Sequence, residues 1–199
     1  MSGPAIVKTL LAKYREIPAV GLDFSFPVSW QMDQDFCQTV TDELRLHGAK
    51  WECRKALPTL HHQVPAKSGV YMFVYRSTLR LDTANDDSFN PTWVLYVGRA
   101  GYSNNNSTLK NRYKSEYSKY VGGNPEILWN NEPITCRADF LKRYLSIYPL
   151  QYWYCIIPDR DKIKLIEDRL IKLLSPPLNR NSRPRLMILP PQPAFRTPS

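Results

Sequence analysis

Two apolar runs between Ser68 and Gly98 constrain the fold of this chain most strongly. The first, SGVYMFVY, begins at Ser68, and the second, WVLYVG, ends at Gly98. Both are rich in aromatic and β-branched residues and are bounded by Gly, Pro, Asn and Asp, which predicts two β-strands joined by a polar loop. Because side chains alternate across a strand, we expect Val70, Met72 and Val74 to face away from Tyr71, Phe73 and Tyr75, and Trp93, Leu95 and Val97 to face away from Val94 and Tyr96.

Hydrophobic periodicity predicts helices around these strands. The expected helices span residues 5–16, 33–46, a stretch from about Thr108, residues 137–148, and a stretch from Asp159 or Asp161 to 174. The apolar residues 150–157 predict another strand, buried on both faces or central in the sheet. The sequence therefore predicts an α/β fold with a small, mostly antiparallel central sheet flanked by helices. We expect an N-terminal helical extension at residues 1–66, a core domain at 67–181 and a basic, proline-rich tail or arm at 182–199.

The charge of the chain is unevenly distributed. Lys and Arg number 27 and Asp and Glu 18, a net charge of +9, yet residues 1–66 carry seven of each sign. The whole excess, 20 basic against 11 acidic side chains, lies in residues 67–199, which favours a polyanionic partner. No stretch approaches the roughly 20 apolar residues of a membrane span, so we expect no membrane partner. Four cysteines without metal-ligand spacing, and no apolar leader, predict free thiols and a cytoplasmic location.

A carboxylate interrupts the apolar stripe of the last predicted helix. Ile163, Ile166, Leu170 and Leu174 recur at helical spacing, and Glu167 falls among them. Burial of an unpaired carboxylate is costly, so Glu167 needs a cation or hydrogen bonds. Two interpretations remain, a salt bridge to an arginine or a metal ligand.

Two other patterns suggest metal binding only weakly. His61 and His62 are adjacent, and we expect their rings to point apart, which makes a metal pair improbable. The segment 81–91 contains Asp82, Asp86 and Asp87 but lacks the glycine and the closing glutamate of a calcium loop. We expect this segment to be a solvated insertion between the two strands.

Several motifs occur in the order found in one nuclease family. The triplets Gly-Val-Tyr at 69–71 and Tyr-Val-Gly at 96–98 resemble the two signature triplets of the GIY-YIG nucleases. They are followed by Arg112 in LKNR, Glu167 in LIEDRLI and Asn179 in PPLN. The resemblance covers roughly residues 67–181 and implies a GIY-YIG nuclease-like fold.

The resemblance also implies roles for individual residues. In this family one divalent ion and a tyrosine-rich pocket cleave a phosphodiester bond, and a carboxylate oxygen suits Mg²⁺ or Mn²⁺. The reference pKa of a phenol is about 10, so a tyrosine base needs nearby positive charge or onward proton transfer. The implied roles are metal ligand for Glu167, base for Tyr71, assistance from Tyr96 and Arg99, phosphoryl stabilisation by Arg112 and fixing of the pocket by Asn179.

The chain departs from the family in the helix that carries Arg112. Members commonly have His or Tyr four residues after this Arg, whereas here Glu116 occupies that position and Tyr117 follows. In a regular α-helix Glu116 lies about 40° around the axis from Arg112, and Tyr117 about 140°. Either Glu116 fills the role, or the role is missing, or Tyr117 fills it through an irregular helix, which is the hypothesis we prefer. Arg99 is a second departure, because the excision-repair branch commonly has Lys there.

These features together predict a metal-dependent DNA endonuclease of the restriction or phage-defence type. The alternatives are a structure-specific DNA-repair nuclease and a non-catalytic nucleic-acid-binding protein that retains the fold. The sequence does not distinguish DNA from RNA. It also leaves open whether the chain acts as a homodimer or in a larger nuclease assembly.

Overall fold

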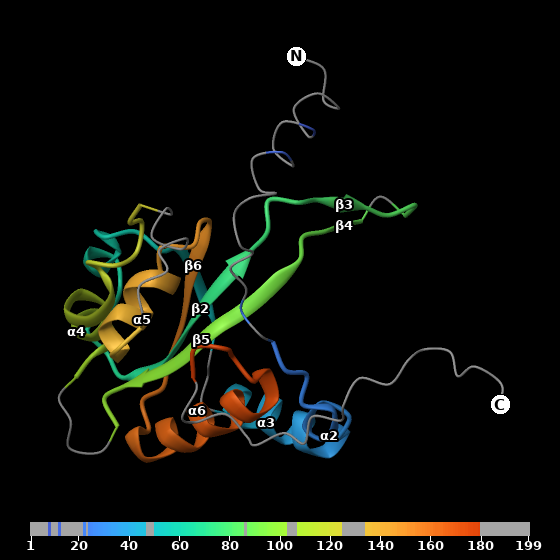
Figure 1. Ribbon diagram of the computed structural model, residues 1–199. Coiled ribbons are helices and arrows are strands. Elements are labelled where there is room, and N and C mark those ends of the chain that lie inside the picture. Colours follow the sequence, from blue (N-terminus) through green and yellow to red (C-terminus); the bar gives the residue numbers. More distant parts are fainter. Residues whose placement is uncertain are drawn as a thin grey trace.

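A computed structural model describes Lys8, Ala12, residue 22 and residues 24–46, 50–85, 87–102, 107–124 and 134–179. In these ranges the chain is a mixed α/β structure in which an antiparallel sheet of four strands lies between two groups of helices (Figure 1). Of the helix predicted at 5–16 only Lys8 and Ala12 are described, and the tail predicted at 182–199 lies outside the described residues. None of the described helices is long and apolar enough to cross a membrane.

The central sheet has the strand order β1-β6-β2-β5. The strands are β1 (Glu52–Lys55), β2 (Gly69–Arg76), β5 (Thr92–Ala100) and β6 (Leu150–Ile156). Every neighbouring pair is antiparallel, and the strand predicted at 150–157 is confirmed as β6, inside the sheet. Strand β1 was not predicted, because its residues ECRK are all exposed and show no apolar alternation. It lies in the segment predicted as a helical extension, so that segment also contributes to the sheet.

A β-bulge separates the two halves of the β2–β5 pairing. The register shifts after Phe73, and Leu95 is the extra residue in β5. Leu95 consequently packs on the opposite face of the sheet from Val97. The prediction that Trp93, Leu95 and Val97 share one face is therefore wrong, because a bulge reverses the alternation of side chains beyond it.

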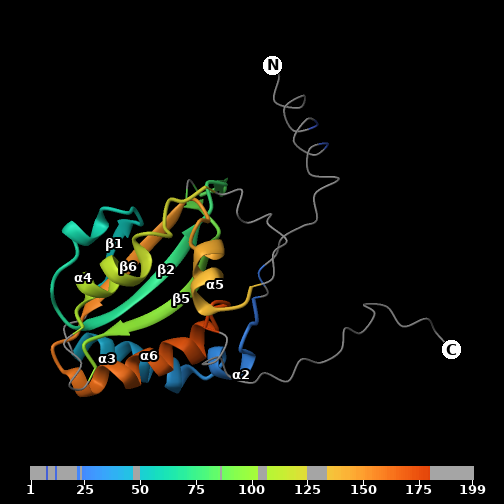
Figure 2. The ribbon, with the colours of Figure 1, turned by 60° about the vertical axis from the view of Figure 1, so that its left-hand side comes forward.

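Each face of the sheet has its own core (Figure 2). One face packs against α4 (Leu109–Arg112), the π-helical turn η2 (Tyr113–Tyr117) and α5 (Arg137–Tyr144). The other packs against α3 (Gln34–Leu46) and α6 (Arg160–Leu174). The alternation predicted for β2 is confirmed in these two cores. The aromatic core contains Tyr71, Phe73, Tyr113, Tyr117 and Tyr152, and the aliphatic core contains Val70, Met72, Val74, Ile163 and Ile166.

The predicted starts of three helices are confirmed by side-chain caps, which satisfy backbone N–H groups that lack an intrahelical partner. Asp33 Oδ1 accepts a hydrogen bond from the backbone N of Phe36 at 2.8 Å. Thr108 and Asp159 cap α4 and α6 in the same way. Helix α5 ends at Tyr144, before the predicted end at 148.

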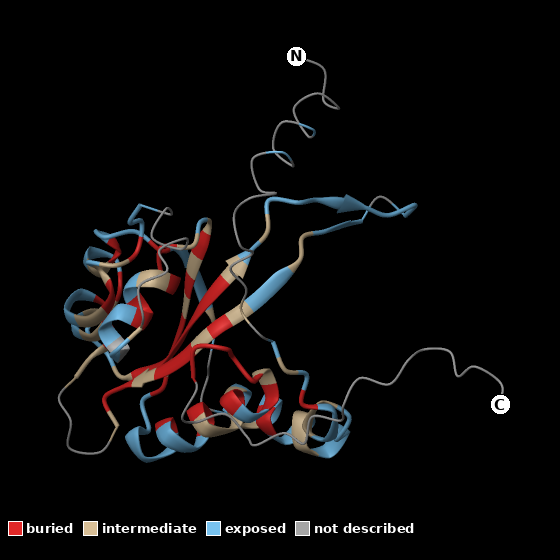
Figure 3. Ribbon diagram, in the orientation of Figure 1, coloured by how far each residue is buried: buried red, intermediate tan, exposed pale blue. Residues whose placement is uncertain are grey.

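The described residues between β2 and β5, 77–85 and 87–91, form a projecting segment that we call the arm. It contains the short antiparallel strands β3 (Leu81–Asp82) and β4 (Ser88–Phe89). Both strands are exposed, in contrast to the buried centre of β2 (Figure 3). The prediction of a solvated insertion is confirmed.

Close packing dictates the glycine at position 98. Gly98 pairs with Tyr71 across the β2–β5 ladder, and a Cβ atom on Gly98 would lie 2.5 Å from both Cζ and Oη of Tyr71. The Tyr71 ring therefore lies directly on the Gly98 backbone. A glycine permits this approach because it has no side chain.

We predict that Gly98→Ala lowers the free energy of unfolding by about 1–3 kcal/mol, because the new methyl group overpacks the buried Tyr71 ring. Urea unfolding measures the change. The control is Gly123→Ala, where the nearest atom to a new Cβ lies 3.2 Å away. Equal losses in the two variants would show that the Tyr71 contact does not determine the residue at position 98.

Candidate functional site

Five of the seven predicted site residues line one pocket beside β5. Its volume is about 440 Å³. Strand β5 lies at an edge of the sheet, so side chains from both helical layers can meet around it. The five residues are Tyr96 and Arg99 from β5, Arg112 from α4, Glu167 from α6 and Asn179 from the segment after α6.

Glu167 is paired with an arginine in this pocket. It is 7 % exposed among the buried apolar residues of α6, as the sequence predicted. Its carboxylate forms an ion pair with the Arg99 guanidinium. The structure thus contains the salt bridge of the first interpretation, with Arg99 as the partner, and metal binding by Glu167 stays a prediction.

Asn179 holds the outer edge of β5. Its Oδ1 accepts a hydrogen bond from the backbone N of Val97 at 2.8 Å, and its Nδ2 donates to the carbonyl O of Val97 at 2.8 Å. The backbone N of Leu178 also donates to the carbonyl O of Leu95 at 2.9 Å. These bonds satisfy edge-strand groups that would otherwise be unpaired. They anchor the chain that leaves α6 to the strand that carries Tyr96 and Arg99.

The helix after Arg112 has the irregularity that our hypothesis for Tyr117 requires. Residues Tyr113–Tyr117 form a π-helical turn, in which the backbone N of Ser118 donates to the carbonyl O of Tyr113 at 2.9 Å. The i→i+5 bond places more residues in one turn than an α-helix does. Tyr117 is thereby brought toward β2, and its hydroxyl lies 2.6 Å from the Tyr71 hydroxyl.

Both residues considered for the position after Arg112 contact its surroundings. The Glu116 carboxylate lies 2.5 Å from a guanidinium nitrogen of Arg112. Arg112 is also within hydrogen-bonding reach of the Tyr71 hydroxyl, and Tyr71 in turn contacts Tyr117. Glu116 therefore reaches Arg112 directly, while Tyr117 reaches it through Tyr71. The catalytic role proposed for Tyr117 stays a prediction.

Tyr71 and Tyr117 lie behind the wall of the pocket. Both are fully buried, and neither lines the pocket. Burial raises the pKa of Tyr71 well above its ordinary value, Tyr96 raises this pKa further, and Arg112 and Tyr117 offset only part of the rise. Burial likewise raises the pKa of Tyr117, as do Tyr71 and Tyr96. Both phenols are therefore neutral at neutral pH, and Tyr96 is the tyrosine of this group that reaches the pocket.

Arg112 keeps one donor without an acceptor. Within the described part of the chain, its buried Nε atom has no hydrogen-bond partner. Burial lowers the pKa of Arg112, but Tyr71, Tyr117 and Glu116 raise it by more, so the guanidinium stays charged. A buried N–H without a partner costs about 1–3 kcal/mol, and an anionic oxygen would satisfy it.

The pocket could hold a metal ion only with help from water or substrate. In the described ranges no group of three or more His, Cys, Asp and Glu side chains lies together. Glu167 and Asp168 supply carboxylate oxygens to the pocket. Mg²⁺ commonly binds one or two carboxylates and keeps several waters or substrate phosphates, so this donor set fits such an ion.

The two adjacent histidines do not point apart as predicted. They lie in the turn η1 (Leu60–His62), and their ring centroids are 4.0 Å apart. His61 Nδ1 lies 3.0 Å from the carbonyl O of Pro58, which fixes the first ring. The prediction is wrong because ring contact orients side chains that the backbone alone would separate. Neither histidine lines the pocket beside β5.

Sequence reasoning missed five further residues that line the pocket: Ala100, Gly101, Tyr102, Ser107 and Asp168. The Tyr102 ring lies 5.2 Å from the Arg99 guanidinium carbon, so it supports the pocket from the side of β5. Asp168 could have been noticed as the neighbour of Glu167.

Comparison with known proteins adds no relative, because no family model, no curated protein and no solved structure matches the chain.

We predict that Asn179→Ala lowers the free energy of unfolding by about 1–3 kcal/mol, because two buried backbone groups of Val97 lose their partners. Chemical denaturation measures the loss. The control is Asn111→Ala in α4, where an exposed side chain is removed and the change should stay within about 0.5 kcal/mol. A similar small change in Asn179→Ala would mean that the contact with β5 is not needed for stability.

The buried tyrosines predict a loss of stability in alkali. In the unfolded chain tyrosines ionise near pH 10, whereas Tyr71, Tyr117 and Tyr152 have raised pKa values in the folded chain and stay protonated. Their contribution is complete below about pH 10 and is lost as the pH rises further, because the unfolded state then binds fewer protons. Urea unfolding between about pH 9 and pH 11 should show this fall, and Tyr71→Phe should make it shallower. An unchanged slope in Tyr71→Phe would contradict the assignment.

Proposed function

We propose that this chain is a metal-dependent endonuclease of the GIY-YIG kind that hydrolyses DNA phosphodiester bonds, of the restriction or phage-defence type. One observation carries the proposal. Residues that the sequence singles out at positions 96, 99, 112, 167 and 179 line a single pocket, although they come from four separate segments of the chain.

The arginines of the pocket supply what a phosphate group needs. Phosphodiester hydrolysis requires positive charge on the phosphate oxygens and a water held in line with the leaving oxygen. Arg99 and Arg112 line the same pocket, and the buried Nε of Arg112 has no acceptor among the described residues. A planar guanidinium can hold two phosphate oxygens at once. The two arginines that line the pocket therefore support an anionic substrate.

The tyrosines divide into two groups under this proposal. Tyr96 lines the pocket and is the one able to touch the substrate or the attacking water. Tyr71 and Tyr117 are neutral and lie behind it, where they position Arg112 through the Tyr71 hydroxyl. The role of base that the family resemblance implies for Tyr71 requires access that this arrangement does not give.

Glu167 would hold the Mg²⁺ or Mn²⁺ ion, with Asp168 beside it in the pocket. When bound, such an ion neutralises charge on the phosphate and lowers the pKa of a bound water. Arg99 already pairs with the same carboxylate. The Arg99 guanidinium and the metal ion would therefore compete for the Glu167 carboxylate.

Two features favour a second candidate, a nucleic-acid-binding protein without catalysis. Arg99 neutralises Glu167, so this carboxylate is not free to bind a metal ion. Tyr71 is buried with a raised pKa, so its phenol does not act as a base. The charge of the chain serves this function equally well, because basic residues exceed acidic ones by 20 to 11 in residues 67–199. Binding without cleavage would show steep salt dependence.

One experiment separates these functions. Supercoiled plasmid, linear duplex, branched DNA, single-stranded DNA and RNA are incubated with the protein in Mg²⁺, Mn²⁺ or EDTA. We predict metal-dependent cleavage of DNA that Glu167→Gln reduces by about 100-fold or more, because the pocket loses its buried carboxylate. Thermal unfolding of the variant checks that it still folds.

The matched control is Glu43→Gln. Glu43 forms an ion pair with Arg169 on α6, but it does not line the pocket, so this variant loses a similar contact without touching the site. Cleavage should survive in Glu43→Gln. Wild-type rates in Glu167→Gln would reject Glu167 as the metal ligand, and salt-sensitive binding with no cleavage of any substrate would favour the second candidate.

A further inference from the structure

The arm exposes apolar side chains on a ribbon of two very short strands. It stands away from the rest of the described chain (Figure 1), and its strands β3 and β4 have two residues each. Leu79, Leu81 and Phe89 are 56 %, 48 % and 58 % exposed. Isolated ribbons of two strands are marginally stable in water, and exposed apolar clusters commonly mark interaction sites.

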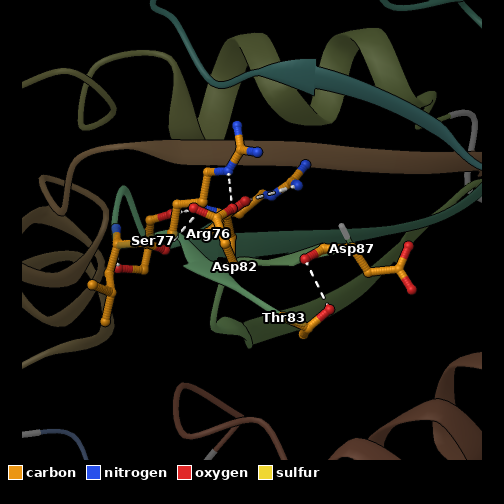
Figure 4. Close-up of polar contacts among 8 residues, drawn as sticks. Arg76, Ser77, Asp82, Thr83 and Asp87 are labelled. Atoms are coloured by element: carbon orange, nitrogen blue, oxygen red, sulfur yellow. Dashed lines mark hydrogen bonds and ion pairs between the residues drawn. The ribbon is translucent and has the colours of Figure 1, made fainter. Parts of the chain in front are cut away.

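Polar contacts nevertheless hold the arm in one shape (Figure 4). Thr83 donates from its backbone N to the carbonyl O of Asp87 at 2.8 Å, and Arg80 Nε lies 2.6 Å from Asp82 Oδ1. The Asn90 Nδ2 atom donates to the carbonyl O atoms of residues 77 and 79 at 3.2 and 2.8 Å. The arm is thus a preformed projection, which lowers the entropic cost of binding.

The same chain has an apolar groove of about 290 Å³ near the base of the arm, where β5 begins. It lies between α2 (Val28–Gln31), the start of β5 and the end of α6, and its lining includes Phe24, Phe26, Trp93 and Leu174. The Gln31 side chain donates to the carbonyl O of Leu173 and so ties α2 to α6. A cavity of about 150 Å³ can hold benzene, so the groove has room for an aromatic ring such as that of Phe89.

Charge favours a protein over a nucleic acid as the partner of the arm. Residues 77–91 contain one Arg and three Asp, a net charge of −2, in a chain whose net charge is +9. An acidic projection repels phosphates but complements a basic protein surface. Lys172, which precedes the groove residue Leu173 in the sequence, lies 5.2 Å over the ring of Trp30 in α2.

We propose that the arm of one copy of this chain inserts into the apolar groove of a second copy, and that the second arm makes the same contact in return. Projection and groove belong to one chain, so two reciprocal contacts close a twofold-symmetric dimer. The reciprocal arrangement doubles the area of a single insertion, and stable interfaces bury about 1,200–2,000 Å² in total. This inference does not depend on the proposed nuclease function.

Sedimentation of the full chain at several concentrations tests the proposal. We predict a dimer for the wild type and at least about a tenfold weaker dimer for Leu81→Glu/Phe89→Glu, because the charged arm no longer fits an apolar groove. The groove variant Phe26→Glu should weaken the dimer in the same way. Leu46→Glu, at an 85 % exposed position outside arm and groove, is the matched control and should remain dimeric. Circular dichroism checks that each variant folds.

Cross-linking identifies which surfaces meet. Leu81→Cys and Phe26→Cys are made separately in a chain whose exposed cysteines, Cys53 and Cys136, are replaced by serine. A short bis-maleimide should join the two variants when they are mixed and should not join either variant to itself. Efficient self-cross-linking of Leu81→Cys would indicate contact between two arms and would overturn the proposal.

Two sedimentation results would also overturn it: a wild type that stays monomeric at all concentrations, or a dimer unaffected by Leu81→Glu/Phe89→Glu. A monomeric wild type whose arm variant loses affinity for duplex DNA would assign the arm to nucleic acid instead. Neither readout requires cleavage activity, so failure here is distinct from failure of the proposed function.

Discussion

The two hydrogen bonds between the Asn179 side chain and the Val97 backbone fix the place of the pocket. Helix α6 ends at Leu174, and the chain returns to the edge of β5 within five residues. Because that return is anchored at Val97, α6 is held against the strand, and its Glu167 meets Arg99, two residues further along β5. The contact that protects the sheet edge therefore also assembles the charged groups of the pocket.

A second constraint acts on the other face of β5. The Tyr71 ring lies on Gly98, and its hydroxyl is enclosed in a core of aromatic rings. A buried hydroxyl without a hydrogen-bond partner costs about 1–3 kcal/mol, and among the described residues Tyr152 in the same core has such a hydroxyl. The π-helical turn provides a partner for the Tyr71 hydroxyl by bringing Tyr117 to Tyr71, and Arg112 at the start of this turn lies within reach of the same hydroxyl. The irregular helix thus supplies a hydrogen-bond partner inside an apolar layer, and π-helical turns are frequent at functional sites.

The sequence predicted those features that depend on local periodicity. The alternation of β2, the cap at Asp159 and the stripe around Glu167 all follow from spacing along one element. The bulge at Leu95 could not be predicted, because an apolar residue there fits either face and only pairing with β2 decides between them. The exposed strand β1 carries no hydrophobic signal at all, so its place depends on the partner strand β6. For the pocket, the sequence predicted five of the residues that line it. The burial of Tyr71 and the choice of Arg99 as the partner of Glu167 depend on packing between elements and could not be predicted.

The ion pair of Arg99 with Glu167 couples the binding of a cation in this pocket to the binding of an anion. A cation that bound alone at Glu167 would have to displace Arg99 and leave the guanidinium without its partner. A phosphate that bound alone at Arg99 would leave Glu167 as a buried carboxylate without a cation, which is costly. When both bind, each group exchanges one partner of opposite charge for another, so each ligand raises the affinity of the other by the same factor. Under the proposed function, the ion pair therefore neutralises Glu167 in the free protein and favours the joint binding of metal ion and phosphodiester.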